Sequence, residues 1–151
     1  MRTARPSDWK IEAMPAKRAV VQLRHDFHSA EMEIIKRGVV PKQMEDKWFV
    51  YWAKDVLHFH RSWTGFCVYE VHFRRSPLGS EMFEAVLNRD SSQYSEINNQ
   101  RDISLISYLI HILLLRTPYP FPSTECDKGQ AALQEWSLSG RASLGEHPDD
   151  A

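Results

Sequence analysis

Two histidines separated by one residue have the spacing in this sequence that could most readily do chemistry. His58 and His60 lie in the segment VLHFHR, whose β-branched and aromatic residues predict a β-strand. Residues two apart on a strand project from the same face, as two ligands of one metal ion or an acid–base pair would. Most such pairs serve packing or hydrogen bonding, and no third ligand can be assigned, so we predict no metal site.

A nucleophilic pair is the second arrangement that the sequence offers. Cys67 follows His60 closely, and a hairpin between them would bring the two side chains together as diagonal neighbours. A buried cysteine is far more often a small, unreactive core residue. We therefore favour packing over catalysis for Cys67, and the sequence specifies neither a catalytic residue nor a cofactor.

Cations and aromatic side chains near the histidines suggest a binding surface. Aromatic rings stack on bases and cations hold phosphate, so this combination fits an anionic, nucleotide-like ligand. The predicted ligand-binding residues are Lys47, Tyr51, His58, His60, Arg61, Trp63 and Arg89.

Arg61 and Arg89 each have a structural alternative. We expect Arg61 to stack on Trp48 and to pair with Glu70, and we favour this over an anion clamp helped by Lys47 or Arg89. Arg89 belongs to a polar turn sequence, NRD, in which it would be solvated. It also follows the end of a predicted strand, where binding residues are often found.

Three consecutive strands would position these residues. The predicted strands are Lys47 to Ala53, Val56 to Trp63 and Phe66 to Arg74, joined by the two-residue turns Lys54-Asp55 and Thr64-Gly65. Loops of this length make an antiparallel meander and fix its register.

In that register Trp52 faces Leu57 and Arg61 faces Val68. One predicted surface carries Trp48, Val50, Trp52, Leu57, Phe59, Arg61, Trp63, Phe66, Val68, Glu70 and His72. The other carries Lys47, Phe49, Tyr51, His58, His60, Ser62, Cys67, Tyr69, Val71 and Phe73. We expect helices to cover the first surface, and the histidine surface to stay partly open without a carboxylate.

Elements before and after the meander complete the predicted fold. Ala19 to Leu23 has a weak strand pattern, and a short helix is expected from an N-cap at Ser29 to Gly38. Met82 to Leu87 suits a fourth strand better than a helix, and Asp102 is expected to cap a helix over Ile103 to Leu115. The fold class is therefore α+β, an antiparallel three- to four-stranded meander packed against two helices, with disordered tails.

The domain boundaries follow from the same patterns. Residues 1–18 are expected to be a flexible N-terminal segment, and residues 19–117 a single α+β domain. The proline-containing, weakly hydrophobic residues 118–151 are expected to be a disordered tail.

Composition excludes some classes of function. The 151 residues carry a formal net charge of −1, which argues against a dedicated double-stranded DNA binder. Two cysteines do not make a disulfide framework, so we expect a cytoplasmic protein. The longest apolar run, Leu109 to Leu115, is interrupted by His111 and is too short to span a membrane, and no secretory signal is recognisable.

Several short sequence words occur together between Phe27 and Leu115. They are EMEIIKRG, MEDKWF, HRSWTGF followed by CVYEV, and NRD with a tyrosine shortly after. With these words the chain resembles a family of small bacterial proteins that has no established activity. The resemblance implies a bacterial cytoplasmic origin and one compact domain, and it implies no functional residue.

Three functions remain as hypotheses. The first and favoured one is a binding module that holds an anionic, nucleotide-like ligand on an aromatic sheet face. The second is a small metal- or histidine-dependent hydrolase centred on His58 and His60. The third is a protein–protein interaction module or homodimer without a small-molecule site, because interfaces favour tryptophan, tyrosine and arginine.

Overall fold

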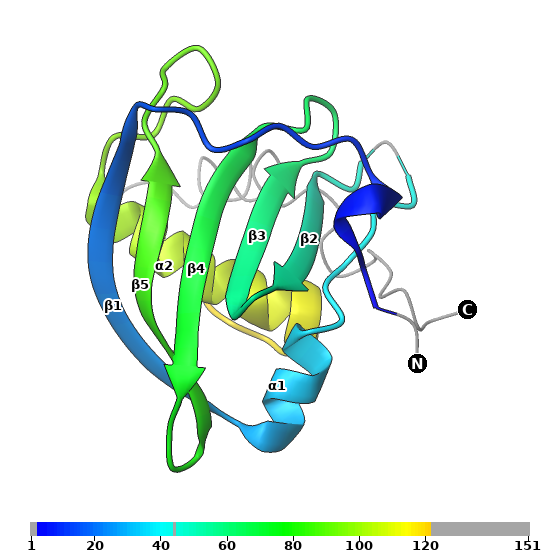
Figure 1. Ribbon diagram of the computed structural model, residues 1–151, viewed down its shortest axis with the longest axis vertical. Helices are drawn as coiled ribbons and strands as arrows, with labels where there is room; N and C mark the ends of the chain where they lie inside the picture. The colour runs from blue at the N-terminus through cyan, green and yellow to red at the C-terminus, as the bar shows by residue number, and fades with distance from the viewer. Residues whose placement is uncertain (1–2, 44, 122–151) are drawn as a thin grey trace.

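Five antiparallel strands form one sheet in the computed structural model, which describes residues 3–43 and 45–121 (Figure 1). The strands are β1 (Arg18–His28), β2 (Trp48–Ala53), β3 (Val56–Arg61), β4 (Cys67–Arg75) and β5 (Gly79–Asn88). Their order across the sheet is β1-β5-β4-β3-β2. The predicted α+β class is confirmed. The predicted number of three to four strands is wrong, because the sheet has five strands and the long β1 pairs with β5.

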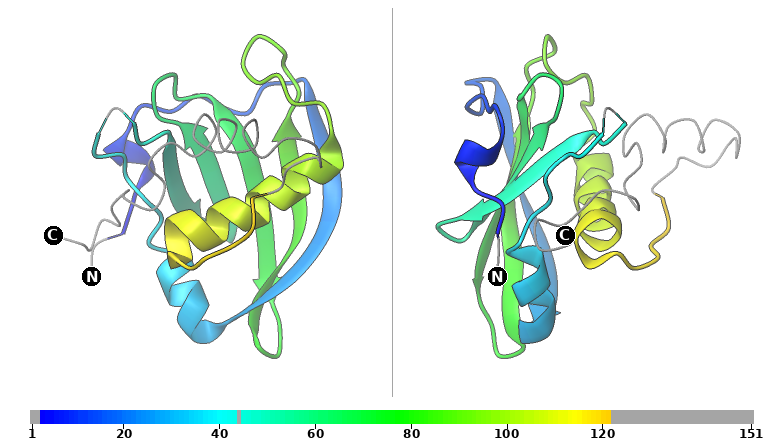
Figure 2. Two further views of the ribbon diagram at one scale, coloured as in Figure 1. Left: turned by 180° about the vertical axis from the view of Figure 1, so that it is seen from behind. Right: turned by 90° about the vertical axis from the view of Figure 1, so that its right-hand side faces the viewer.

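Two helices pack against the sheet. α1 (Ser29–Ile35) follows β1, and α2 (Asn99–Leu109) continues into a π-helical segment, Ile110–Leu115. Figure 2 shows α2 crossing one face of the sheet. We call this the helix face, and its buried side chains include Val50, Leu57, Phe59, Tyr69, Val71, Phe73, Ala85 and Leu87, packed against Ile106, Leu109, Ile110 and Leu113. None of the helices within the described residues is long and apolar enough to cross a bilayer.

The β2–β3 hairpin has the predicted register. Trp52 lies opposite Leu57, and Trp48 lies opposite Arg61. The turn residues Lys54 and Asp55 have φ angles of 53° and 63°. Two consecutive residues with positive φ are typical of the tight turn whose twist matches that of the flanking strands.

The β3–β4 connection differs from the prediction. Five residues, 62–66, separate the strands, and the Gly65 N–H donates to the Arg61 carbonyl while the Arg61 N–H donates to the Phe66 carbonyl. His58 consequently faces Glu70, and His60 faces Cys67 after an irregularity in the pairing.

This shift exchanges residues between the two predicted surfaces of the sheet. Tyr69, Val71 and Phe73 belong to the helix face, whereas Glu70 lies beside His58 on the opposite face. We call the opposite face the outer face; it carries Phe49, Tyr51, His58, His60, Cys67, Glu70 and His72. The prediction that the histidine surface lacks a carboxylate is therefore wrong.

The N-terminal segment covers part of the outer face, as the right-hand view of Figure 2 shows. Its short 3₁₀ helix, Pro6–Asp8, precedes Trp9, whose ring stacks 6.4 Å from Phe49 and whose indole N–H donates to the Ser62 carbonyl. A Cβ on Gly65 would lie 2.9 Å from the Lys10 carbonyl oxygen, so the close approach requires glycine. The described part of residues 1–18 thus packs on the sheet, and most of residues 118–151 lies outside the described residues.

The predicted helices are present with different N-terminal caps. His28, rather than Ser29, caps α1, since its Nδ1 accepts from the Glu31 N–H. Asn98 caps α2 by accepting from the Arg101 N–H, which places Asp102 inside the first turn and fully buried. The predicted strand at Met82 to Leu87 is confirmed within β5.

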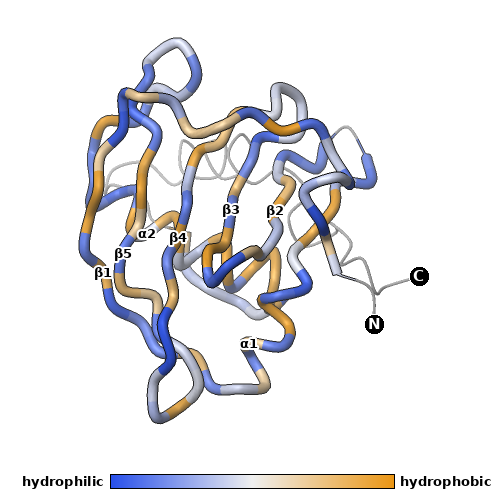
Figure 3. Tube along the Cα trace, viewed as in Figure 1, coloured by the Kyte–Doolittle hydropathy of each residue, from blue (hydrophilic) through white to orange (hydrophobic). Residues whose placement is uncertain are grey.

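Figure 3 shows how the hydropathy of the residues changes along the strands. β4 changes from hydrophobic residues to hydrophilic ones at its C-terminal end, where Arg74 and Arg75 are exposed. Charged residues are therefore concentrated at the β4–β5 hairpin, next to α1.

Candidate functional site

The structure divides the seven predicted ligand-binding residues among three places. Tyr51, His58 and His60 are neighbours on the outer face. Lys47 and Trp63 contact each other at the end of the β2–β3 hairpin, where the Lys47 ammonium lies 4.4 Å from the centre of the Trp63 ring. The two arginines belong to the helix side of the sheet, so the seven residues do not make one site.

His60 is held under the N-terminal segment. It is 2 % exposed, and its Nδ1 lies 2.9 Å from the Gly65 carbonyl, which requires Nδ1 to carry the proton. Burial is the main reason that the pKa of His60 is lowered. Its Nε2 is buried without a hydrogen-bond partner among the described residues. These properties suit a neutral core histidine.

His58 is more accessible and has a carboxylate partner. Its ring stacks on Tyr51 at 4.5 Å, and its Nδ1 lies 3.3 Å from a Glu70 carboxylate oxygen. The hydrogen bond from His58 is the main reason that the pKa of Glu70 is lowered. His58 and Glu70 thus form an oriented imidazole–carboxylate pair on the outer face.

Cys67 has the properties of a core residue. Its side chain is 1 % exposed and packs with Met14 and Val86. Burial raises the pKa of its thiol, which disfavours the reactive thiolate. The nucleophilic pair of Cys67 and His60 therefore has no support in the structure.

Arg61 stacks on Trp48, as predicted. Its guanidinium carbon lies 4.8 Å from the centre of the Trp48 ring. The expected ion pair with Glu70 is wrong, because Glu70 lies on the other face and pairs with His58. The shifted register of β3 and β4 explains this difference.

Arg89 belongs to a buried polar network beneath α2. Its guanidinium pairs with the Asp102 carboxylate and also donates to the Asn99 side-chain oxygen. The Tyr69 and Tyr94 hydroxyls donate to the other Asp102 oxygen over 2.8 and 2.6 Å. Burial raises the pKa of both tyrosines. This network ties β4, the loop after β5 and α2 together, and its charges are already compensated.

A pocket lies elsewhere, where α1 meets the ends of the strands. It has a volume of about 480 Å³. Three segments line it. The first is α1 and the residue after it, with Ser29, Met32, Glu33 and Lys36, and the second is the end of β2 and its turn, with Trp52 and Asp55. The third is the β4–β5 hairpin, with Phe73, Arg74, Arg75, Gly79 and Ser80. We call it the α1–hairpin pocket.

Local sequence features position each wall of this pocket. Gly38, with a φ of 68°, ends the turn after α1, and the left-handed Lys54 and Asp55 place the β2–β3 turn. A Cβ on Gly79 would lie 2.5 Å from the Phe27 carbonyl oxygen and 2.7 Å from the Ser29 nitrogen. Glycine at position 79 therefore allows the hairpin to approach the start of α1.

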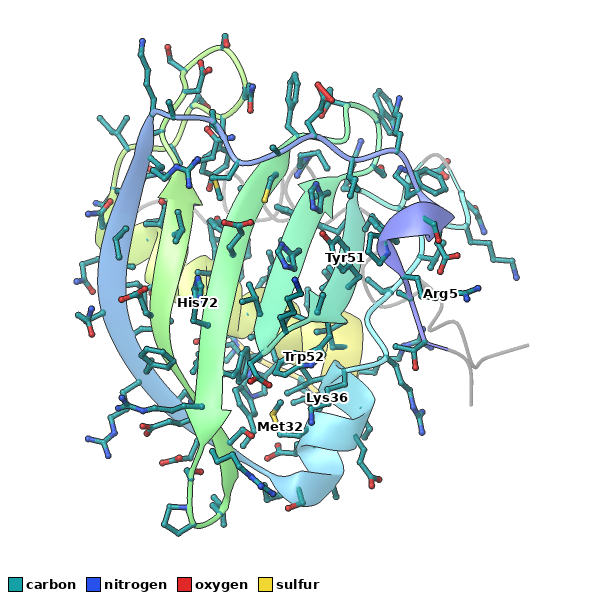
Figure 4. All side chains as sticks on the ribbon, in the orientation of Figure 1. Arg5, Met32, Lys36, Tyr51, Trp52 and His72 are labelled. Carbon is teal, nitrogen blue, oxygen red and sulfur yellow. The ribbon has the colours of Figure 1, made fainter. Side chains whose placement is uncertain are left out.

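The floor of the α1–hairpin pocket is aromatic and its rim is charged. The half-buried Trp52 ring packs against Phe73 at 5.1 Å, and the Lys36 ammonium lies 5.3 Å from the centre of the Trp52 ring. Figure 4 shows Lys36, Met32 and Trp52 together at the junction of α1 and the sheet.

Two of the three cations in the pocket are uncompensated. Arg74 donates to Glu81 over 2.6 Å, whereas Lys36 and Arg75 form no ion pair with any described residue. Glu33 and Asp55 are exposed carboxylates on the same rim. The pocket therefore offers a flat ring, two available cations, two hydroxyls and two hydrogen-bond acceptors.

Sequence reasoning missed this pocket. The predicted register places Trp52 on the helix-covered surface, and the sequence gives Lys36 no role in a site. Lys36 follows α1 directly, and it meets Trp52 because the next segment pairs with β2 through Val39 and Val50; no local signal specifies that contact.

Residues 3–43 and 45–121 contain no group of three or more histidine, cysteine, aspartate or glutamate side chains placed to hold a metal ion. The chain matches no family model, no curated protein and no solved structure. The site must therefore be interpreted from its own geometry.

Proposed function

We propose that the protein is a binding module for a small anionic ligand that carries an aromatic ring, of the nucleoside phosphate type. The ligand would occupy the α1–hairpin pocket, rather than the histidine surface. The observation that carries the proposal is the combination of Trp52 with Lys36 and Arg75, which have no carboxylate partner among the described residues.

The dimensions of the pocket support a ligand of this size. Its volume of about 480 Å³ falls within the usual range of small-molecule sites. Phe73 and Met32 are buried behind Trp52, so the apolar floor has a rigid support.

The chemistry of each group supports a nucleoside phosphate. An aromatic ring of the ligand would stack on Trp52, taking the place of the Lys36 ammonium, which would turn toward the ligand's anionic group. The planar guanidinium of Arg75 would donate two hydrogen bonds to the same anion. Glu33 and Asp55 would accept hydrogen bonds from hydroxyl or amino groups of the ligand.

A thermal-shift screen with nucleoside mono- and diphosphates tests the proposal, because a ligand that binds only the folded state raises the melting temperature. Lys36→Ala and Arg75→Ala should each weaken binding about tenfold or more, since each removes one charge-assisted hydrogen bond. Trp52→Leu should remove the preference for ligands with a ring. Lys10→Ala and Arg5→Ala remove exposed cations distant from the pocket and should leave the shift unchanged.

A histidine-dependent hydrolase is the second candidate, supported by one observation. Glu70 fixes the orientation of His58 and leaves Nε2 available to act as a general base on water. Hydrolysis of simple esters that is lost in His58→Gln but retained in His72→Gln would support this candidate. Hydrolysis equal in both variants, or none in the native protein, would exclude it.

A further inference from the structure

β1 leaves one edge of the sheet uncovered. It is eleven residues long, and among the described residues it pairs only with β5. Figure 1 shows β1 along the left border of the sheet with no other labelled element beyond it. A long edge strand presents unpaired backbone N–H and C=O groups that can accept another strand.

The opposite edge of the sheet is not equivalent. There, Val39 and Val50 exchange two backbone hydrogen bonds of 3.0 Å, which cap part of β2. Strand addition is therefore available at β1 rather than at β2.

The side chains of β1 alternate between exposed positions and partly or fully buried ones, although the pairing of β1 with β5 is irregular between Gln22 and His25. On the helix face, Ala19, Val21 and Leu23 pack at the margin of the core and stay partly exposed. On the outer face, Val20 is 57 % exposed. Such a margin would gain apolar contacts from a strand laid beside it.

We propose that β1 pairs antiparallel with β1 of a second copy of the chain, which joins two sheets into one across a twofold axis. In this arrangement Gln22 lies at the axis opposite Gln22 of the other copy. Arg18 of each copy then lies opposite Asp26 of the other, and Val21 opposite Leu23. Outer-face residues meet outer-face residues, as the alternation of a strand requires.

Opposite charges on β1 favour a second copy of the chain as the partner, and they favour this register. The Asp26 carboxylate is exposed and has no ion pair among the described residues. Arg18 donates through Nε and Nη2 to the Pro15 and Met14 carbonyls, which leaves Nη1 for a carboxylate. The symmetry makes this ion pair twice.

Neighbouring registers are less favourable. An axis at Val21 would place Arg18 against Arg24, and an axis at Leu23 would place Asp26 against Val20. An axis at His25 would also oppose Arg24 and Asp26, but Arg24 already pairs with Glu81, and the two His25 rings would face each other. Of the four registers compared, the one centred on Gln22 is the one that places Arg18 opposite Asp26.

Sedimentation of variants in which the charge at position 18 or 26 is reversed tests the proposal, because it measures the oligomeric state. The native protein should sediment as a dimer, and Arg18→Glu and Asp26→Arg should each be monomeric, because each places like charges opposite each other. A mixture of the two variants should recover a dimer of one copy of each, since every pair across the axis is then complementary. Arg5→Glu should leave the native dimer intact, and circular dichroism checks the folding of each variant.

A cross-link provides a second measurement that does not depend on charge. In a Cys126→Ser background, Gln22→Cys should form a covalent dimer on mild oxidation, because directly opposed residues in a strand pair are close enough for a disulfide. Val20→Cys should not, since it faces Arg24. A native protein that is monomeric at its highest soluble concentration would overturn the proposal, as would dimers that persist in both charge variants or equal cross-linking at positions 20 and 22.

Discussion

The Arg89 guanidinium and the Asp102 carboxylate form an ion pair between the loop after β5 and the first turn of α2. Asp102 is fully buried, and only 15 % of the Arg89 side chain is exposed. Asp102 also accepts from Tyr69 and Tyr94, so one carboxylate satisfies three donors. A buried charge of this kind is tolerated because its partners are all in place.

Replacing Asp102 with asparagine should destabilise the fold strongly. Asp102→Asn leaves the Arg89 charge without a counterion, and breaking a buried pair costs about 3–5 kcal/mol. Chemical denaturation measures the loss. Asp90→Asn is the matched control, because among the described residues the Asp90 carboxylate accepts only from Ser92 in its own loop. Equal stability of the two variants would mean that the network contributes little.

The stability of the fold should fall as the pH falls below the ordinary pKa of histidine. Burial lowers the pKa of His60, so the unfolded chain takes up a proton at a higher pH than the folded protein does. The contribution of the neutral His60 to the free energy of unfolding is therefore fully present above a pH of about 6.5, and it is lost as the pH decreases toward the pKa of the folded state. Each pH unit in that interval costs about 1.4 kcal/mol.

Denaturation at several pH values between neutral and mildly acidic tests this prediction. His60→Gln should reduce the dependence of unfolding free energy on pH, and the part that remains should come from His25, whose pKa is also lowered by burial. His72→Gln, which changes a histidine on the accessible part of the outer face, should retain the native slope. Identical slopes in all three proteins would contradict the prediction.

Cys67 should react with thiol reagents only when the protein opens. Its thiol is buried, and its raised pKa keeps it protonated. In a Cys126→Ser background, labelling of the native protein should be slow and should accelerate with denaturant in step with unfolding. Rapid labelling of the folded protein would restore the nucleophilic alternative.

Local turn chemistry determined how much of the sheet could be predicted. Lys54 and Asp55 stand between two clear strand patterns, and their two-residue turn gave the β2–β3 register correctly. The second turn was predicted wrongly, because the Arg61 N–H donates to the Phe66 carbonyl and the Gly65 N–H donates to the Arg61 carbonyl, which makes the connection five residues long. Strand β3 therefore ends at Arg61, and the register changes.

Contacts between distant segments limited the prediction of the site. Asp102 has the sequence signature of a helix cap, but its partners Tyr69 and Arg89 lie on other elements. Lys36 and Trp52 meet because the segment after α1 pairs with β2 through Val39 and Val50. Composition led to the hypothesis of aromatic and cationic chemistry, whereas tertiary packing determines which of those side chains meet.

The most direct test of the proposed function is an NMR titration of the ¹⁵N-labelled protein with adenosine monophosphate. We predict saturable shifts of the Trp52 indole N–H and of backbone amides in α1, the β2–β3 turn and the β4–β5 hairpin, which together line the pocket. The same titration of Lys36→Ala should require a higher ligand concentration. Absence of shifts at a ligand concentration of about 1 mM, or shifts confined to the outer face around His58, would contradict the proposal.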